Sequence, residues 1–330
     1  MTDPTLATTY EWGRMYARTR GGPPTVPSIT TVIGTLAQDL EWWESLCAAD
    51  AAIEQAPLLA QIVAMPDGPE RTDRLVKAQR WLRDAATRDR DQASVRGDAV
   101  HDYAEQVAKQ VVGLATDADI ADAEARCLAV GADQYLRAFE RFWRRFRPVP
   151  VMVEATVWSG LHAYAGTTDM LCLIDLPGEP GVPAVLDWKT KKALYMESGR
   201  AKVSDVRDHT AMQLAATAYA DEVWVRGATP ELDTWEPMRF VPEVGVGVAI
   251  APDGATVRQF DIYDPLVWDS FLALRRAWEF KREGALRMSP RVQSPASLKR
   301  MSPPPPQVVA RGAQNPTPQG LPTSPHTASL

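Results

Sequence analysis

The sequence predicts a mixed α/β protein of the α+β class, with a helical first half and a strand-rich second half. Three observations lead to this fold class. Between Ser28 and Phe146, apolar residues recur every three or four positions, which is typical of amphipathic helices. Pro148 and Pro150 end that pattern. Beyond them, short apolar segments separated by turn-forming residues indicate β-strands.

The composition is that of a folded protein without a membrane span. Of the 330 residues, 45% are hydrophobic and 24% are charged, and no run of about 18 apolar residues occurs. The N-terminal residues lack the apolar core of a signal peptide, so we expect a cytoplasmic protein. Three cysteines, widely spaced and odd in number, favour reduced thiols over disulfides or a zinc site: Cys47, Cys127 and Cys172.

The net charge alone neither requires nor excludes a nucleic-acid partner. The whole chain carries −6, and the segment from Gly284 to Leu330 has five basic residues and no acidic ones. Because that segment carries +5, the preceding body carries about −11. An acidic body can still contain a local basic groove, so the positions of the charges matter more than their sum.

The first half is predicted to be a flexible leader followed by helices. Residues 1–27 are rich in Gly, Pro and Thr and are expected to be the leader. Thr30 or Thr31 is expected to cap a first helix with apolar residues through Leu46. Later helices are predicted over Arg74–Ala86, Val95–Leu114 and Ala118–Phe146, the last broken near Gly131. Residues 28–147 therefore form a predicted helical subdomain.

The second half is predicted to hold the sheet, over residues 148–288. Its strands are expected at Val151–Trp158, Ala165–Ile174, Ala184–Thr190, Glu222–Val225, Arg239–Ile250 and Thr256–Tyr263. Helices are expected at Ser204–Ala220 and Pro265–Glu283. The remaining residues, 289–330, are rich in Pro, Ser, Gln and Thr, so we expect a disordered, basic tail.

The strongest local motif is Leu186-Asp187-Trp188-Lys189-Thr190. In a strand, Asp187 and Lys189 share one face while Leu186 and Trp188 point into a core. A carboxylate that holds a divalent cation beside a lysine is suited to phosphodiester hydrolysis, because the cation activates water and the lysine stabilises developing charge. A lone D-x-K is more often a surface ion pair, so further residues are needed.

Asp169 supplies a second carboxylate on the preceding predicted strand. If the two strands form a hairpin, Asp169 lies within one or two cross-strand pairs of Asp187 and Lys189. Two buried carboxylates repel one another unless a cation holds them. Taken alone, Asp169 is more often a turn or capping residue, but the pair with hairpin spacing favours a site.

Three other polar residues are candidates for the same site. His101 lies in a periodic helix, and its side chain leans over Gly97, which leaves room for the imidazole and a ligand. Gln213 follows the D-x-K strand on a helix, where its amide can bond a phosphate or a catalytic carboxylate. Glu154, on the first strand, is a further candidate carboxylate. Each of these alone is more often structural.

Two basic stretches are candidates for DNA contact. Residues 137–147 hold five Arg and four aromatic residues, and residues 189–202 are rich in Lys and Arg. Such stretches can clamp phosphates and stack on bases, although the first is equally an amphipathic helix with a solvated arginine face. The predicted contacts are Arg141, Arg144, Arg145, Lys191, Lys192, Arg200 and Lys202.

The order of these motifs resembles the RecB-like nucleases of the PD-(D/E)xK superfamily. The chain has G-x-x-x-H, then E, then G-x-x-D, then D-x-K, then Q, and it opens with Pro27-Ser28-Ile29-Thr30-Thr31. It is most similar to bacteriophage exonucleases of the CRISPR-associated RecB-like type, over about Ser28 to Glu283. The resemblance implies a restriction-endonuclease-like core, with a mixed central sheet flanked by helices and a helical subdomain packed on it.

The resemblance also implies particular residue roles. It makes His101, Asp169, Asp187 and the backbone carbonyl of Trp188 ligands of Mg²⁺ or Mn²⁺, Lys189 the catalytic lysine and Gln213 the motif glutamine. The chain departs from the family where a Tyr often follows this Gln by four residues, since Thr217 stands there and the nearest Tyr is Tyr219. Four cysteines for an iron–sulfur cluster are lacking, so no cluster is expected.

The sequence thus leads to a metal-dependent DNA exonuclease that acts on DNA ends in phage recombination or replication, in the host cytoplasm. A single-strand annealing protein is a candidate partner, and no membrane is expected. Two alternatives remain open: a structure-selective endonuclease with the same site, and a catalytically inert DNA-binding or scaffold protein. The complete set of His101, Asp169, Asp187 and Lys189 argues against the inert form.

Overall fold

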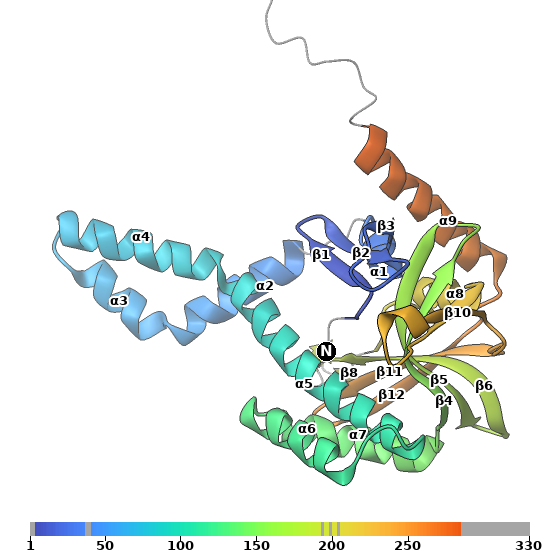
Figure 1. The fold of residues 1–330 in the computed structure, drawn as a ribbon. Coiled ribbons are helices and arrows are strands. Elements are labelled where there is room, and N and C mark those ends of the chain that lie inside the picture. The colour runs from blue at the N-terminus through green and yellow to red at the C-terminus, as the bar shows by residue number, and fades with distance from the viewer. Residues whose placement is uncertain (1–3, 37–40, 193–194, 198–199, 203–204, 285–330) are drawn as a thin grey trace, which may run out of the picture. The chain divides into compact units, whose positions relative to one another are not determined.

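The computed structural model describes residues 4–36, 41–192, 195–197, 200–202 and 205–284, which all belong to one compact unit. The predicted tail lies outside these residues. The fold is mixed α/β, with a seven-stranded mixed sheet that has helices on both of its faces (Figure 1). The predicted boundary between residues 147 and 148 does not divide the core, because helices before it and strands after it share one apolar cluster.

The predicted flexible leader is wrong for the described residues. Residues 7–27 form a three-stranded antiparallel sheet of β1 (Ala7–Tyr10), β2 (Gly13–Ala17) and β3 (Pro24–Pro27). Consecutive buried residues of β2 anchor it, since Met15 and Tyr16 are both only 1% exposed. The segment has few apolar residues in a row, which concealed its strands.

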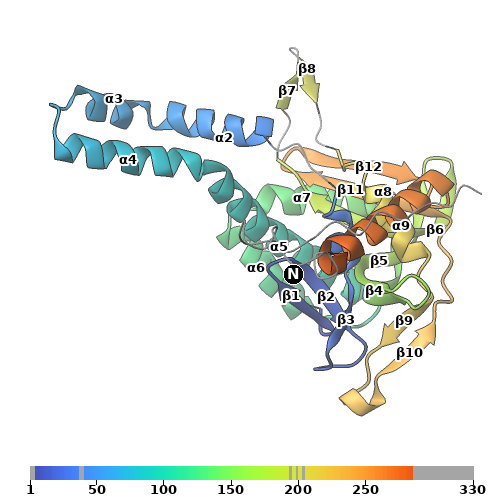
Figure 2. The ribbon, with the colours of Figure 1, turned by 90° about the horizontal axis from the view of Figure 1, so that it is seen from above.

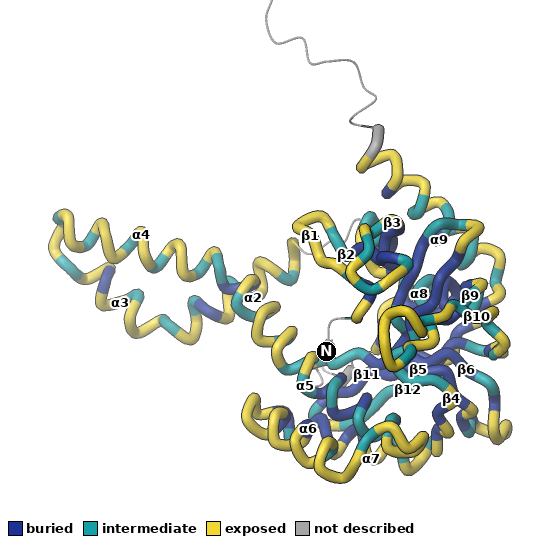
Figure 3. The backbone as a smooth tube through the Cα atoms, viewed as in Figure 1, coloured by how far each residue is buried: buried dark blue, intermediate teal, exposed yellow. Residues whose placement is uncertain are grey.

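The first predicted helix is also wrong in its extent. The short helix α1 (Ile29–Ile33) is capped by Ser28, whose side chain accepts a hydrogen bond from the backbone N–H of Thr31. A separate helix, α2 (Glu41–Glu54), follows. Next come α3 (Ala56–Ala64), which was not predicted, and α4 (Pro69–Arg83). Figures 1 and 2 show α3 and α4 side by side and apart from the sheet, and Figure 3 shows them mostly exposed.

The later helices of the first half match the prediction more closely. The long helix α5 (Ala85–Val111) overlaps the predicted 95–114 segment but starts and ends earlier than it, and α6 (Asp117–Ala129) and α7 (Asp133–Phe146) replace the last predicted helix. The break is where it was expected, because Gly131 adopts a φ of 69° between α6 and α7.

The main sheet is built on three long antiparallel strands, which confirms the predicted hairpin. These are β4 (Val149–Ser159), β5 (Tyr164–Leu176) and β6 (Glu179–Thr190). The order across the sheet is β10-β9-β4-β5-β6-β11-β12. Strand β11 (Val244–Ala251) runs parallel to β6, and its partner β12 (Gly254–Phe260) is antiparallel at one edge.

The remaining elements include three short strands that were not predicted, and the two helices among them have shifted ends. These elements are the β-strands β7 (Tyr195–Glu197), β8 (Arg200–Lys202), β9 (Glu222–Val225) and β10 (Thr234–Pro237), and the helices α8 (Thr210–Ala218) and α9 (Pro265–Glu279), the last continued by a π-turn at Phe280–Gly284. Helix α8 begins later than predicted, and β7, β8 and β10 were not predicted.

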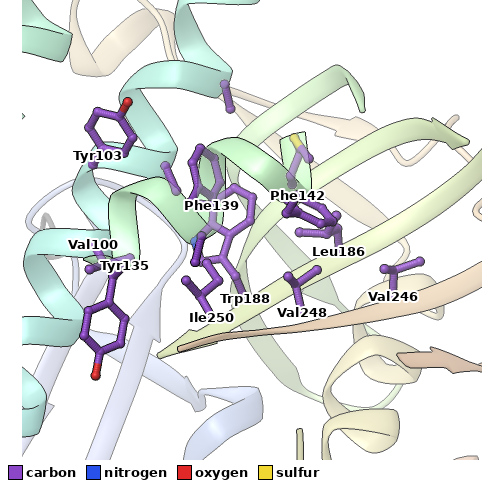
Figure 4. Close-up of a cluster of buried hydrophobic side chains, with 14 of the residues drawn as sticks. Val100, Tyr103, Tyr135, Phe139, Phe142, Leu186, Trp188, Val246, Val248 and Ile250 are labelled. Atoms are coloured by element: carbon purple, nitrogen blue, oxygen red, sulfur yellow. The ribbon is translucent and has the colours of Figure 1, made fainter. Parts of the chain in front are cut away.

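The two faces of the sheet are covered by different helices. On one face, Leu186 and Trp188 of β6 pack with α5 and α7, and the Trp188 ring lies 5.9 Å from the Phe139 ring, edge to face (Figure 4). On the other face, Val185 packs with Leu214 and Ala215 of α8. Truncating a buried aromatic such as Trp188 to Ala typically costs about 3–5 kcal/mol. The sheet is therefore held rigidly from both sides.

Within the described residues, no single helix combines the length and apolarity needed to cross a bilayer. Helices α2 and α3 meet the length and composition criterion only as a pair, and they are bent by 71° relative to each other.

Candidate active site

Asp187 and Lys189 lie near the C-terminal end of β6 and point away from the Trp188 core. Strand β6 is flanked by β5 on one side and β11 on the other, so it is central in the sheet. Asp187 is 2% exposed and shares its face with Val185, whereas Leu186 and Trp188 belong to the opposite core. The alternation predicted from the sequence is thus confirmed.

Asp169 of β5 faces Asp187 across the hairpin, as predicted. Met170 pairs with Leu186, and the next residues along the two strands are Asp169 and Asp187. One carboxylate oxygen of Asp169 accepts a hydrogen bond of 2.9 Å from the backbone N–H of Trp188. This bond holds the Asp169 carboxylate against β6, between the two residues of the D-x-K motif.

Lys189 and Gln213 both bind the same oxygen of Asp187. The Lys189 ammonium donates to Oδ1 at 2.8 Å and the Gln213 amide donates to Oδ1 at 2.6 Å. Among the described residues, the second oxygen, Oδ2, is buried without a hydrogen-bond partner. A buried carboxylate oxygen without a partner is costly, which makes Oδ2 the natural place for a further positive group.

Glu154 of β4 joins the two aspartates from the other side of β5. Val153 pairs with Met170 and Ala155 with Thr168, so Glu154 lies across from Asp169. Its φ is 51°, a left-handed conformation that is uncommon for a residue with a side chain. Burial, and then the charge of Asp169, raises the pKa of Glu154 to about 9.

Burial also raises the pKa values of Asp169 and Asp187, although Lys189 opposes that shift in both. Burial acts to lower the pKa of Lys189, but the nearby Asp187 and Asp169 outweigh it and the pKa is raised. The lysine is therefore held as an ammonium ion among carboxylates that are poorly stabilised in their charged form.

His101 reaches the site from α5, as predicted. The imidazole is 9% exposed, and its Nδ1 has no hydrogen-bond partner among the described residues. Burial, and then the charge of Lys189, lowers its pKa to about 4, so the ring is neutral at pH 7. Gly97 was expected to leave room for the imidazole and a ligand, but the structure shows another reason for a glycine there. A side chain there would meet the Thr190 hydroxyl at 3.1 Å, so the glycine lets α5 approach β6.

Glu105, which lies one helical turn after His101, was not predicted as a residue of the site. It is 4% exposed and pairs with Lys109, and its charge helps to raise the pKa of Asp169 and Glu154. The spacing of four residues between His101 and Glu105 was the available signal, because such residues share one helix face.

A small cavity of about 80 Å³ brings all the predicted catalytic side chains together. Glu154, Asp169, Asp187, Lys189, Gln213 and His101 line it. Six residues of the N-terminal part of the chain also line it, and none of these was predicted to do so: Pro4, Arg14, Tyr16, Ser28, Ile29 and Thr30. The Tyr16 hydroxyl lies 2.9 Å from the Thr167 hydroxyl, which fixes β2 over the end of β5.

The described residues contain no group of three or more His, Cys, Asp or Glu side chains that could hold a metal ion as they stand. Two buried atoms at the cavity nevertheless lack a partner, Asp187 Oδ2 and His101 Nδ1. A carboxylate oxygen and a neutral imidazole nitrogen are both common ligands of divalent metal ions. The donor set therefore fits a cation, although it is not a preformed cluster. The Trp188 carbonyl, the other predicted ligand, belongs to β6 between Asp187 and Lys189.

The predicted DNA contacts on α7 do not reach this cavity. Arg141 and Arg145 line a separate groove of about 690 Å³ with Phe142, Phe146 and residues of β12, which we call the α7 groove. Arg144 lies beside Glu140, whose carbonyl accepts its Nε hydrogen bond. The structure thus favours the amphipathic-helix interpretation of this segment, with Phe139 and Phe142 in the core.

The second basic stretch is only partly described. Lys192 forms an ion pair of 2.7 Å with Asp89 of α5. Burial, and then the charge of Arg207, lowers the pKa of Lys191, which lies two residues beyond Lys189. The side chains of Arg200 and Lys202 lie outside the described part of the structure.

Thr217, at the position where the resembled family often has Tyr, lines the cavity and donates from its hydroxyl to the Gln213 carbonyl at 3.2 Å. Tyr219 instead stacks on Trp268, with ring centroids 4.2 Å apart. Tyr219 therefore contributes to the packing between α8 and α9. Of the cysteines, Cys127 and Cys172 are buried thiols and Cys47 is partly buried, and all three are free.

Comparisons with known proteins leave the family open. No family model matches the chain, and no curated protein matches it in sequence. One solved structure, titled "Crystal structure of SSO0001", is 14% identical, with a TM-score of 0.24 over 58% of this chain and 75% of that one.

Proposed function

We propose that this chain is a divalent-metal-dependent deoxyribonuclease of the RecB-like PD-(D/E)xK type that degrades DNA from its ends. The observation that carries the proposal is the unpartnered Oδ2 of Asp187, buried beside Asp169, Glu154 and Lys189. A carboxylate oxygen in such surroundings is stabilised by a cation, and a lysine held next to it is suited to phosphate chemistry. The mixed sheet flanked by helices is the core that this family would require.

Asp187, Asp169 and His101 would hold Mg²⁺ or Mn²⁺, with the Trp188 carbonyl as a further ligand. When bound, the metal would activate a water molecule and neutralise charge on the phosphate. Lys189 would position that water or stabilise negative charge on the scissile phosphate, because its ammonium already lies 2.8 Å from Asp187. Gln213 orients the Asp187 carboxylate through the bond to Oδ1.

The electrostatics of the cavity support a cation rather than a neutral ligand. Burial raises the pKa values of Glu154, Asp169 and Asp187 together. A divalent cation among them would restore their charged forms, because opposite charge lowers a carboxyl pKa. The neutral imidazole of His101 is already in the form that binds a metal.

Attack on DNA ends is supported by how the cavity is enclosed. Residues from β2, α1 and α5 lie around it, in addition to the sheet and α8. A strand with a free end can enter such a space more easily than the middle of a closed duplex. We further propose action in the cytoplasm, in phage DNA recombination or replication.

The proposal is tested with linear and covalently closed circular DNA. With Mg²⁺ or Mn²⁺ we expect rapid loss of linear DNA and little action on circles, whereas Ca²⁺ should support binding but poor cleavage. Asp187→Ala and Asp169→Ala should each abolish cleavage in a folded protein. Asp175→Ala, at the far end of β5, is the matched control and should retain activity, since Asp175 accepts hydrogen bonds from Arg147 and from the turn at Gly181, away from the cavity.

Three other outcomes would count against this function. Near wild-type cleavage by Asp187→Ala or Asp169→Ala would show that the carboxylate cavity is not the site of cleavage. Equal nicking of linear and circular DNA would favour an endonuclease. Binding without cleavage in every metal, by well-folded protein, would favour a catalytically inert DNA-binding protein.

A further inference from the structure

A second hollow opens directly beside the carboxylate cavity. It has a volume of about 950 Å³ and lies between the β1–β2 turn, α1 and the end of α9. We call it the terminal groove and define it by Trp12, Arg14, Thr30, Trp278, Lys281 and Arg282. Arg14 and Thr30 line both the groove and the cavity, so the two spaces meet at these residues.

The groove has an aromatic floor. The Trp12 side chain is 48% exposed, and its ring stacks on Tyr10 with centroids 4.9 Å apart and planes 5° apart. The Trp278 ring lies 6.4 Å from the Trp12 ring. An indole ring held flat on one side by a stacked tyrosine, with only a flexible side chain over its other side, can serve as a stacking platform for a planar group.

The groove is also locally positive in an acidic chain. Its lining includes three basic residues, Arg14, Lys281 and Arg282, and one acidic residue, Glu11. The Arg282 guanidinium lies over both indoles, 4.5 Å from the Trp12 centroid and 5.4 Å from that of Trp278. Cations placed beside stacking rings match a ligand that alternates phosphates with flat bases.

We infer that the terminal groove binds single-stranded DNA and guides it into the carboxylate cavity. Bases would stack on Trp12, and phosphates would contact Lys281, Arg282 and Arg14, the last at the entrance to the cavity. Unpaired DNA fits better than a duplex, because the base faces of a duplex are already stacked on one another. The guiding role rests on the proposed function, whereas the binding of single strands does not.

The test measures binding without cleavage. A fluorescein-labelled oligothymidylate of about 20 nucleotides, long enough for typical single-strand sites, is titrated with the full chain in EDTA and followed by fluorescence anisotropy. Trp12→Ala should weaken binding at least about fivefold, which corresponds to the lower end of stacking on one base. Trp12→Phe should retain most of the affinity.

Trp42→Ala is the matched control, because Trp42 is also an exposed tryptophan, 72% exposed, but lies on α2. It should bind like the wild type. Lys281→Gln is a second variant of the groove, and it tests the inference even if Trp12→Ala fails to fold. It should lower the slope of log affinity against log salt by about 0.7, the value for one phosphate contact on a single strand.

The inference is overturned if Trp12→Ala and Lys281→Gln both bind the oligonucleotide as the wild type does. It is also overturned if Trp12→Ala weakens binding of a blunt hairpin duplex as much as binding of the single strand. A third contrary result is that Trp12→Ala weakens binding of a protein partner but of no DNA. These outcomes are separate from the nuclease test. If single-strand binding depends on Trp12 but no DNA is cleaved, the nuclease proposal is wrong and the groove proposal holds. If DNA is cleaved but Trp12→Ala changes neither binding nor cleavage, the groove proposal is wrong and the nuclease proposal holds.

Discussion

The α7 groove and the terminal groove contain the same kinds of residue but differ in how the chain makes them. Arg141, Phe142, Arg145 and Phe146 of the α7 groove lie within six positions of one helix. The terminal groove joins β2 near the start of the chain to α9 near the end of the described residues. Both present arginine beside aromatic rings, but only the terminal groove shares residues with the carboxylate cavity.

The difference shows that a dense basic segment in the sequence need not lie beside the carboxylate cavity. In α7, the amphipathic pattern is needed for the core, because Phe139 and Phe142 pack against the sheet. Its arginines then lie on the remaining, solvated face. Only the tertiary structure decides which cations lie beside the carboxylate cavity.

The largest effect should come from the cavity at which the terminal groove ends. Lys189→Met keeps most of the side-chain stem but removes the ammonium that bonds Asp187. We expect turnover to fall by several orders of magnitude while metal binding survives, because the charge acts mainly on the transition state. Single-turnover cleavage and calorimetry with Mn²⁺ measure the two quantities. Loss of metal binding instead would make Lys189 a structural residue.

Removing two positive charges from each groove in turn compares the two grooves directly. Lys281→Gln with Arg282→Gln should lower the salt slope of single-strand binding by about 1.4, from two phosphate contacts. Arg141→Gln with Arg145→Gln removes the same charge from the α7 groove and should change binding less than about twofold, as for a screened charge outside the site. Fluorescence anisotropy at several salt concentrations measures the affinity for the single strand and its salt slope. Equal losses for the two pairs would remove the distinction between the grooves.

The smallest effect concerns the stability of the cavity without metal. The pKa of Glu154 is about 9 in the fold, against 4.5 ordinarily, so the folded protein binds this proton more tightly than the unfolded chain does. Its stability should therefore fall as the pH rises from about 4.5 towards 9. In EDTA at about pH 8, Glu154→Gln should raise the free energy of unfolding by at least about 1 kcal/mol, the equivalent of a single pKa unit, which is at least roughly 2–4 °C in Tm.

Near pH 4 the same substitution should have little effect, because Glu154 is protonated in both states. Glu236→Gln, which changes an exposed glutamate of β10, should leave Tm unchanged at either pH. Differential scanning calorimetry at the two pH values tests this prediction. A Tm that does not respond to Glu154→Gln at pH 8 would show that the cavity tolerates the charged glutamate.

The local motifs of the site could be predicted because they depend on strand geometry. Asp187 and Lys189 had to share a face, and hairpin pairing had to bring Asp169 near them. His101 and Gln213 were correctly brought to the same cavity by the order of motifs, although spacing alone leaves their distances open. Elements with strong apolar periodicity, such as α5 and β4 to β6, were also predicted well.

The missed elements are those whose stability comes from distant contacts. The β1–β2–β3 sheet was taken for a leader, because its strands are short and its apolar residues are few. Tyr16 and Val26 are buried only because they pack on Trp158 and Ala165 of the main sheet, more than a hundred residues later. No local pattern can signal a core that the rest of the chain supplies.

The sequence by itself determined which residues can carry chemistry and on which face of a strand they lie, since the pleat alternates side chains over neighbouring positions. Only the tertiary structure decided that Arg14 enters the carboxylate cavity and that Trp12 meets Trp278 and Arg282. The physical reason is that strand and helix periodicity act over a few residues. The meeting of the two ends of the chain depends on how helices and sheets pack, to which the whole buried surface contributes.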